Sequence, residues 1–125
     1  MKAYKGFNKD MTCRGFQFEE GKTYHEDSAE LCRNGFHACE DPLDCFSYYE
    51  PAKSVYHEVE LDEVADEERL NDSKICGKTI KIGAKLDIAG ICKAHFEFVK
   101  SKTEKSEFSY GLWVSERVNR HGGEK

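Results

Sequence analysis

The chain has 125 residues, of which 38% are hydrophobic and 34% charged. That length fits one domain with a core of useful size, and eight Phe, six Tyr and one Trp exclude the composition of a disordered chain. No apolar stretch approaches the roughly 20 residues that span a bilayer, and residues 1–10 hold no signal-peptide run. We therefore expect a cytosolic protein without membrane contact, whose six cysteines are reduced.

The charge is unevenly distributed along the chain. Residues 1–70 carry a net charge of −9 and residues 71–125 a net charge of +4, which together give −5. The acidic half argues against direct, non-specific binding of nucleic acid, and the basic half is compatible with a local patch that faces phosphate.

The first third of the chain predicts short extended pieces. Residues 2–7 (KAYKGF) indicate a first strand, and residues 13–18 (CRGFQF) a second extended piece or a strand bulged at Gly15. Gly21 predicts a turn before a short extended segment at residues 23–25.

Two short helices are then expected, on either side of an extended piece at residues 36–39. Residues 27–35 predict one or two helical turns ended by Asn34 and Gly35. The second helix has the clearest signals, because Asp41 suits an N-cap and Pro42 the first helical position. The apolar face of this helix is expected to contain Leu43, Phe46 and Tyr49, and its end to lie at Pro51.

The second half predicts long elements. Residues 54–61 alternate cleanly and indicate a half-buried strand, with His57 on its apolar face. Residues 74–82 and 108–118 indicate two further strands, and residues 86–102 carry the apolar stripe of a helix capped by Asp87.

The expected fold is α+β: a single domain in which about five short strands form one mixed or antiparallel sheet packed by two or three helices. Residues 1–103 make up the main domain, and residues 104–125 add a C-terminal strand and a flexible tail to the same domain.

Metal-ligating residue types are concentrated in one segment. Weak candidates for a zinc site are Cys32, His37, Cys39 and Cys45. The Cys-x2-Cys spacing of zinc knuckles is absent, so buried thiols beside a packed histidine are the favoured interpretation, and we expect no metal and no cofactor.

Motifs for catalysis are missing. The chain has no Gly-x-Ser-x-Gly elbow, no phosphate loop and no Gly-x-Gly-x-x-Gly. No catalytic residue is assigned, and a non-enzymatic role is favoured although the question of enzyme activity is left open. Four residues are candidates for a pocket, with core packing as the alternative for each: Tyr4, His37, Tyr49 and His57.

Seven of the eleven residues from Glu58 to Glu68 are acidic. Such a run is usually a solvated surface, but it could also mimic a phosphate chain and bind a basic groove on a partner. The candidate partner-binding residues in this acidic segment are Glu58, Glu60, Asp62, Glu63, Asp66, Glu67 and Glu68.

Several quoted motifs resemble a domain family of bacteriophages and prophages. They are KAYKGFNKDMTCRGFQFEEGKTY, NGFHACEDPLDCFSYY, DSKICGKTIKI and DIAGICKAH, over roughly residues 2–100. Family members often carry repeats after this domain, whereas this chain departs from the pattern after about residue 103. The resemblance implies a viral protein in the host cytoplasm.

A weaker resemblance, to the ADP-ribosyltransferase fold, rests on KAYKGF, NGFHACEDPLDCFSYY and SVYHEVELDEV. It implies that Tyr4 and His37 hold the ribose of NAD and that Tyr49 stacks on nicotinamide. A catalytic glutamate has no clear counterpart, since Glu58 and Glu60 are only guesses, so this likeness implies a nucleotide-binding or degenerate domain.

Two functions are therefore carried forward. The first is a small acidic phage protein that inhibits a host protein or ribonucleoprotein, such as a CRISPR-type defence nuclease, by protein–protein contact. The alternative is an NAD- or nucleotide-binding domain.

Overall fold

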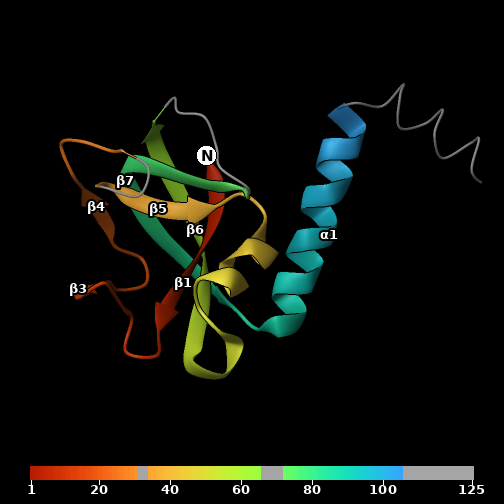
Figure 1. The fold of residues 1–125 in the computed structure, drawn as a ribbon, viewed down its shortest axis with the longest axis horizontal. Helices are drawn as coiled ribbons and strands as arrows, with labels where there is room; N and C mark the ends of the chain where they lie inside the picture. Colours follow the sequence, from red (N-terminus) through yellow and green to blue (C-terminus); the bar gives the residue numbers. More distant parts are fainter. Residues whose placement is uncertain (31–33, 66–71, 106–125) are drawn as a thin grey trace, which may run out of the picture. The chain divides into compact units, whose positions relative to one another are not determined.

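The structure is a computed structural model that describes residues 1–30, 34–65 and 72–105. These residues form an α+β fold of antiparallel strands, as expected, with one α-helix and two 3-10 helices (Figure 1). Contacts divide the chain into two compact units, residues 1–95 and 96–125. Strand pairing, core and candidate site described below all belong to the first unit.

Seven strands and three helices make up the described chain. The strands are β1 (Lys2–Asn8), β2 (Thr12–Cys13), β3 (Phe16–Gln17), β4 (Thr23–His25), β5 (Phe36–Cys39), β6 (Ser54–Val64) and β7 (Lys74–Leu86). The helices are the 3-10 helices η1 (Pro42–Ser47) and η2 (Pro51–Lys53) and the α-helix α1 (Ile88–Lys105).

Four strands pair in a closed ring. β1 pairs with β6 over its whole length, β6 pairs with β7, β7 pairs with β5, and β5 pairs with β1, all antiparallel. β4 adds to the edge of β7 beyond β5. The link between β1 and β5 is short, because Tyr4↔Cys39 is the registered pair between them.

The ring encloses the main core. Its inward residues are almost all apolar, and Phe18 enters from the segment after β3 to pack against Phe7 at 5.2 Å between ring centroids. The buried residues are Ala3, Phe7, Phe18, Phe36, Ala38, Val59, Leu61, Ile75, Ile80 and Ile82. A second cluster lies beneath η1 and the start of α1, and it consists of Tyr4, Cys39, Cys45, Tyr56 and Ile91.

Two expected elements differ in the structure. The segment 13–18 is a hairpin of β2 and β3 rather than one strand, because Arg14 and Gly15 both have positive φ, as in the tight turns that suit twisted strands. Residues 27–30 are not helical: an isolated bridge joins Glu30 to Asn34, and Gly35 N donates to Glu26 Oε2 at 2.8 Å. The bond from Gly35 N to Glu26 spans nine residues, so it is not one that a helical turn would make.

The expected helix after Asp41 begins where the sequence indicates. Asp41 Oδ1 accepts the N–H of Leu43, and Pro42 is the first helical residue. The helix is 3-10 rather than α, which suits a segment of only six residues. One α-helix is thus present among the described residues where two or three helices were expected.

The expected strand at 108–118 and the C-terminal tail lie outside the described residues. Within the part that is described, no helix is both long and apolar enough to cross a membrane.

Candidate functional site: a basic cavity between two strands

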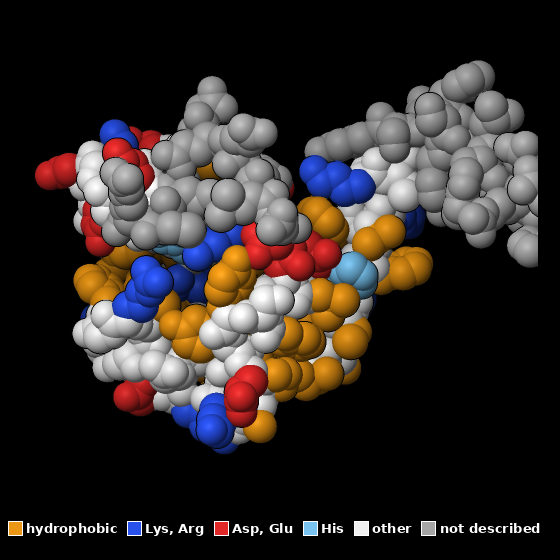
Figure 2. All heavy atoms as spheres, in the orientation of Figure 1, with side chains coloured by type: hydrophobic (Ala, Val, Ile, Leu, Met, Phe, Trp, Pro, Cys, Tyr) orange, Lys and Arg blue, Asp and Glu red, His pale blue; other side chains and the backbone are white. Residues whose placement is uncertain are grey.

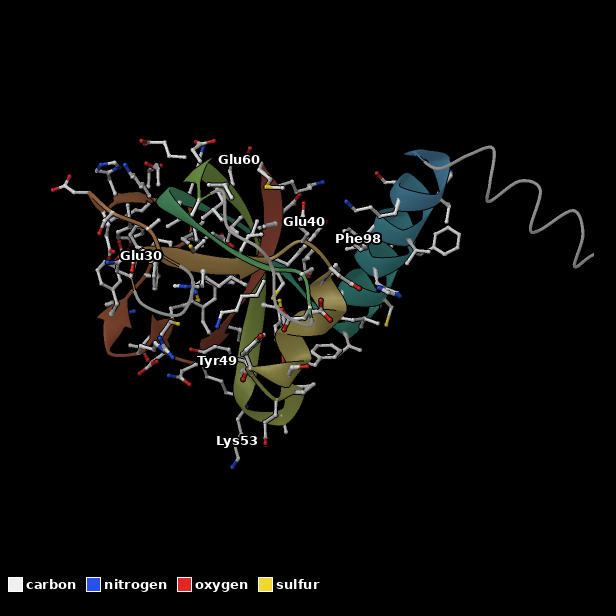
Figure 3. The ribbon with its side chains drawn as sticks, turned by 45° about the horizontal axis from the view of Figure 1, so that its top comes forward. Glu30, Glu40, Tyr49, Lys53, Glu60 and Phe98 are labelled. Atoms are coloured by element: carbon white, nitrogen blue, oxygen red, sulfur yellow. The ribbon has the colours of Figure 1, made fainter. Side chains whose placement is uncertain are left out.

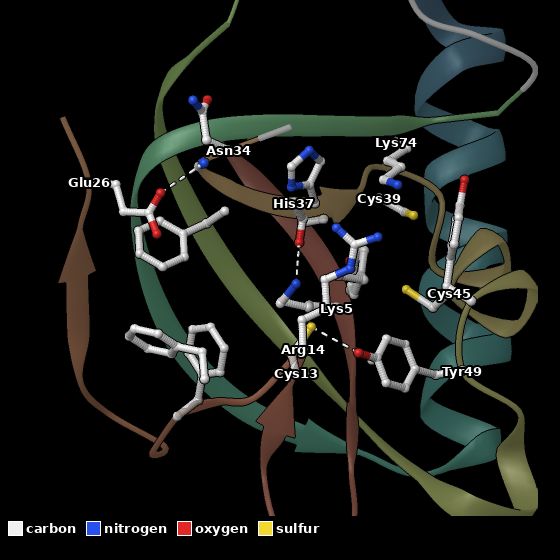
Figure 4. Close-up of a pocket in the computed structure, with 18 residues that line it drawn as sticks. Lys5, Cys13, Arg14, Glu26, Asn34, His37, Cys39, Cys45, Tyr49 and Lys74 are labelled. Atoms are coloured by element: carbon white, nitrogen blue, oxygen red, sulfur yellow. Dashed lines mark hydrogen bonds between the residues drawn. The ribbon is translucent and has the colours of Figure 1, made fainter. Parts of the chain in front are cut away.

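A cavity of about 500 Å³ lies where β1 and β5 diverge (Figure 4). Its walls come from residues of β1 at and after Tyr4, from residues 34–39, from the β2–β3 hairpin and from η1 with the residues after it. β1 and β5 share one registered pair, Tyr4↔Cys39, and beyond it the two strands separate. Their separation opens the ring at this point and gives access to the cavity.

Basic residues outnumber acidic ones in this cavity. Lys5, Arg14 and Lys74 line it, against one carboxylate, that of Glu26. The Glu26 carboxylate already accepts a hydrogen bond from Gly35 N. Figure 2 shows blue Lys and Arg side chains gathered in a hollow of this face, bordered by hydrophobic side chains.

The other lining side chains are mostly aromatic or contain sulfur. The aromatic residues are Tyr4, Phe16, Phe18, Phe36, Tyr48 and Tyr49, and the thiols are Cys13, Cys39 and Cys45. Phe16 and Tyr48 are 43% and 47% exposed, so their rings are accessible to a ligand at the rim.

Lys5 is a buried lysine of the cavity. It occupies an inward position of β1 between Ala3 and Phe7, and it is 8% exposed. Its Nζ donates to the carbonyl oxygen of His37 at 2.7 Å and lies within 6 Å of the Phe7 and Phe18 ring centroids. Burial lowers the pKa of the Lys5 amine, and this effect is partly opposed by the neighbouring Cys13 thiol.

The surroundings of His37 in the cavity keep its imidazole uncharged. Burial lowers the pKa of its imidazole to about 4, and the charges of Lys74, Lys5 and Arg14 add to the effect. The ring is therefore neutral at pH 7, with one nitrogen as a hydrogen-bond donor and the other as an acceptor.

Tyr49 closes one side of the cavity. A Cβ on Gly6 would lie 2.8 Å from the Tyr49 Cβ, so the absence of a side chain at Gly6 allows Tyr49 to pack against β1. The Tyr49 hydroxyl donates to Cys13 Sγ at 2.9 Å, and burial raises the pKa of that hydroxyl. This contact connects η1 and its following residues to the β2–β3 hairpin.

The rim beside η1 is tied together by polar contacts. The Tyr48 hydroxyl donates to the Asp72 carboxylate, and the Lys74 Nζ lies 4.6 Å from the centroid of the Tyr48 ring. Asp44 Oδ2 accepts the N–H of Ser73 at 2.9 Å. Residues far apart in the sequence are thus held together at the cavity mouth.

The residues considered for zinc are only partly together. Cys39 and Cys45 are buried neighbours, and burial with the hydrogen bond to Cys39 raises the pKa of the Cys45 thiol. Among residues 1–30, 34–65 and 72–103, no three His, Cys, Asp or Glu side chains gather in a way that could hold a metal. Cys32 lies outside the described residues.

Three of the four pocket candidates meet in the cavity: Tyr4, His37 and Tyr49. His57 is not among the lining residues. It is buried, its Nδ1 donates to the carbonyl oxygen of Gly83 at 2.9 Å, and its ring meets Phe7 edge-on at 5.5 Å. His57 therefore has the packing role that was the alternative at each of these positions.

None of the described acidic residues of the segment 58–68 lines the cavity. These residues lie on β6, where Figure 3 labels Glu60. Glu58 pairs with Lys2 at 2.7 Å, and Glu60 pairs with the amino group of Met1 at 2.6 Å. Asp62 is 3.7 Å from the same amino group, and Glu63 accepts the Thr79 hydroxyl at 3.2 Å. Asp66, Glu67 and Glu68 lie outside the described residues.

The basic residues of the cavity are not singled out by the sequence pattern. A signal for Lys5 was present, because a lysine at an inward position of an alternating strand is unusual. Arg14 and Lys74 gave no comparable signal, since a turn residue and the first residue of a strand are ordinary places for surface charge.

Comparison with known proteins assigns a family. The chain belongs to the family described as a domain of unknown function, DUF7666, whose model matches residues 1–94. That span contains every residue that lines the cavity. No curated protein and no solved structure matches the chain.

Proposed function

We propose that this domain binds a small anionic ligand with a planar ring, of the nucleotide class, in the cavity between β1 and β5. The observation that carries the proposal is the combination of Lys5, Arg14 and Lys74 with aromatic walls in one cavity. The cavity volume of about 500 Å³ falls in the range of roughly 300–1,000 Å³ that small-molecule sites occupy.

Each group of lining residues suits one part of such a ligand. The Arg14 guanidinium offers a planar fork of donors that matches phosphate, and Lys74 adds a second cation at the rim. The accessible rings of Phe16 and Tyr48 can stack on a base. The neutral His37 and the Tyr49 hydroxyl supply hydrogen bonds to sugar hydroxyls, as the likeness to ADP-ribosyltransferases would suggest.

Binding is favoured over group transfer. The two glutamates considered as catalytic, Glu58 and Glu60, pair with Lys2 and with the N-terminal amine and do not line the cavity. The lining carboxylate, Glu26, is engaged by Gly35 N. We therefore assign no catalytic residue to the cavity.

Calorimetry with NAD and ADP-ribose tests the proposal, with adenosine as the ligand that lacks phosphate. We expect Arg14→Ala and Lys74→Ala each to weaken binding about 5- to 30-fold, because each removes a charge-assisted contact of about 1–2 kcal/mol. Lys53→Ala is the matched control: Lys53 lies in η2 with its side chain pointing away from the cavity (Figure 3). Absence of heat with NAD and with ADP-ribose would reject the proposal.

A second proposal is based on the acidic segment. Asp62 and Glu63 are exposed on β6, and Asp66, Glu67 and Glu68 follow them in sequence. Such a row could occupy a basic groove of a host macromolecule, such as a CRISPR-type nuclease in the cytoplasm of a phage-infected cell. Reversing the charges of Glu63, Asp66, Glu67 and Glu68 should weaken binding to a partner purified from the host, and unchanged affinity at low salt would refute it.

A further inference from the structure

We infer that the Lys5 amine forms a reversible imine with a small carbonyl compound that also carries an anionic group. The inference rests on the proposed function, because the basic rim would hold the anion while the carbonyl group reaches the amine.

The surroundings of Lys5 favour a neutral amine. Nζ is buried with the rings of Phe7 and Phe18 nearby, and in the described part of the chain it has no carboxylate partner. A buried ammonium without a counter-ion is costly, so burial lowers the pKa of this amine. A neutral amine has a free electron pair and is a nucleophile at neutral pH, which an exposed lysine is not.

The amine also has a structural role, which the experiment must separate from reactivity. It donates to the His37 carbonyl oxygen at the point where β1 and β5 diverge, and it satisfies an acceptor there. This structural role needs only an N–H group that donates to the His37 carbonyl oxygen, whereas imine formation also requires that a ligand can reach the amine. Lys5 lines the cavity and therefore meets the second requirement as well (Figure 4).

The proposed step is a condensation that needs no oxidant or reductant. The amine nitrogen attacks the carbonyl carbon, and one of its protons moves to the oxygen to give a carbinolamine. Loss of that hydroxyl with the second nitrogen proton releases water and leaves a carbon–nitrogen double bond. The Cys13 thiol, which neighbours the Lys5 amine and accepts the Tyr49 hydroxyl, is placed to relay the proton.

Pyridoxal 5′-phosphate is a suitable probe, since it combines an aldehyde, a phosphate and a planar ring. The full chain is incubated with the probe and cyanoborohydride, which reduces the imine, and the labelled lysines are mapped by mass spectrometry. We expect Lys5 to be labelled about tenfold faster than the exposed Lys9 and Lys53, in spite of its burial. Pyridoxine 5′-phosphate, which lacks the aldehyde, should compete.

Three variants test whether the fast adduct forms on Lys5. Lys5→Met should abolish the fast adduct, Arg14→Ala should slow it and Lys53→Met should leave it unchanged. If Lys5→Met does not fold, the map of the wild-type adducts decides alone. Labelling of Lys9 and Lys53 ahead of Lys5 would overturn the inference. If ADP-ribose nevertheless binds in calorimetry, the proposed function stands; if neither NAD nor ADP-ribose binds, the proposed function fails too.

Discussion

Gly35 fixes the backbone at the start of β5, beside the cavity. Its φ is 84°, and a Cβ there would lie 2.7 Å from Ala29 Cβ and 3.0 Å from the Gly77 carbonyl oxygen. A left-handed backbone costs a residue with a side chain about 1–2 kcal/mol, and the overlap adds to that cost. We expect Gly35→Ala to lower the free energy of unfolding by about 2–4 kcal/mol, measured by denaturant titration.

Gly21 provides the matched control for Gly35. Its φ is 86°, and a Cβ there would meet nothing within 4 Å. Gly21→Ala should therefore cost only the backbone term, about 1 kcal/mol. Equal losses for the two variants would show that the contact with Ala29 does not matter.

His37 should make stability depend on pH. The pKa of its imidazole is lowered from 6.5 to about 4, so the folded state binds this proton less readily than the unfolded state. Its contribution is fully present above pH 6.5 and is lost as pH falls toward 4. Because solvent reaches part of the ring, we expect a loss of about 1–2 kcal/mol.

The measurement is denaturant unfolding at several pH values between 7 and 4 for the wild type and His37→Gln. Subtracting the two curves removes the titration of the carboxylates, which both proteins share. A wild type that loses no more stability than His37→Gln over this range would contradict the assignment.

At this scale the sequence indicated some residues of the site and not others. Tyr4, His37 and Tyr49 stand out because aromatic and titratable side chains are concentrated around them. Lys5 has only its unusual inward position on a strand as a signal, and Arg14 and Lys74 look like surface residues until β1, the hairpin and β7 are brought together. Their shared location depends on contacts between distant segments, which local patterns do not contain.

At the scale of elements, Asp41 joins η1 to the first turns of α1. Its Oδ1 accepts the Leu43 N–H at 3.1 Å and the His95 Nδ1–H at 2.7 Å. We expect Asp41→Ala to cost about 1–2 kcal/mol, as losing a helix cap does. A double-mutant cycle with His95→Ala, followed by thermal or denaturant unfolding, should give a coupling of about 0.5–1 kcal/mol.

Asp27→Ala is the control for this prediction. The Asp27 side chain is exposed and lies 3.7 Å from His25 Nε2, so its removal should change stability little. A loss as large as that of Asp41→Ala, or additive effects of Asp41→Ala and His95→Ala, would count against the cap and its link to α1.

The elements themselves followed local patterns to different degrees. Residues 54–61 of β6 alternate cleanly, residues 2–7 and 74–82 also indicate strands, and the starts of η1 and α1 follow Asp41 and Asp87, so these elements are predicted from sequence. The helix expected at 27–35 is absent at residues 27–30 and 34–35, where Glu26 accepts Gly35 N and a bridge joins Glu30 to Asn34, and residues 31–33 lie outside the described residues. Local propensity cannot reveal such partners.

In the molecule as a whole, the way the strands close into a ring determines where the cavity lies. β7 has 13 residues and pairs with β4, β5 and β6, whereas β1 and β5 share one registered pair. The α+β class could be predicted because it depends on which elements are present. The cavity could not, because it depends on which strands pair and where the pairing stops.

Acidic and basic side chains occupy different parts of this ring of strands. Glu58 and Glu60 of β6 pair with Lys2 and with the N-terminal amine, while Lys5, Arg14 and Lys74 line the cavity. Binding of a phosphate-bearing ligand should therefore weaken as salt is raised, because added ions screen charges at the rim. Calorimetry of ADP-ribose at low and physiological ionic strength checks this, and an affinity independent of salt would contradict it.

We propose that the cavity between β1 and β5 is the ligand site, and an NMR titration of the labelled full chain with ADP-ribose tests this proposal most directly. Amide shifts should be concentrated at Lys5, Cys13, Arg14, Gly35 and Lys74, which line the cavity, with little change at Asp62 and Glu63 on β6. Shifts confined to β6, or no shifts at saturating ligand, would contradict it.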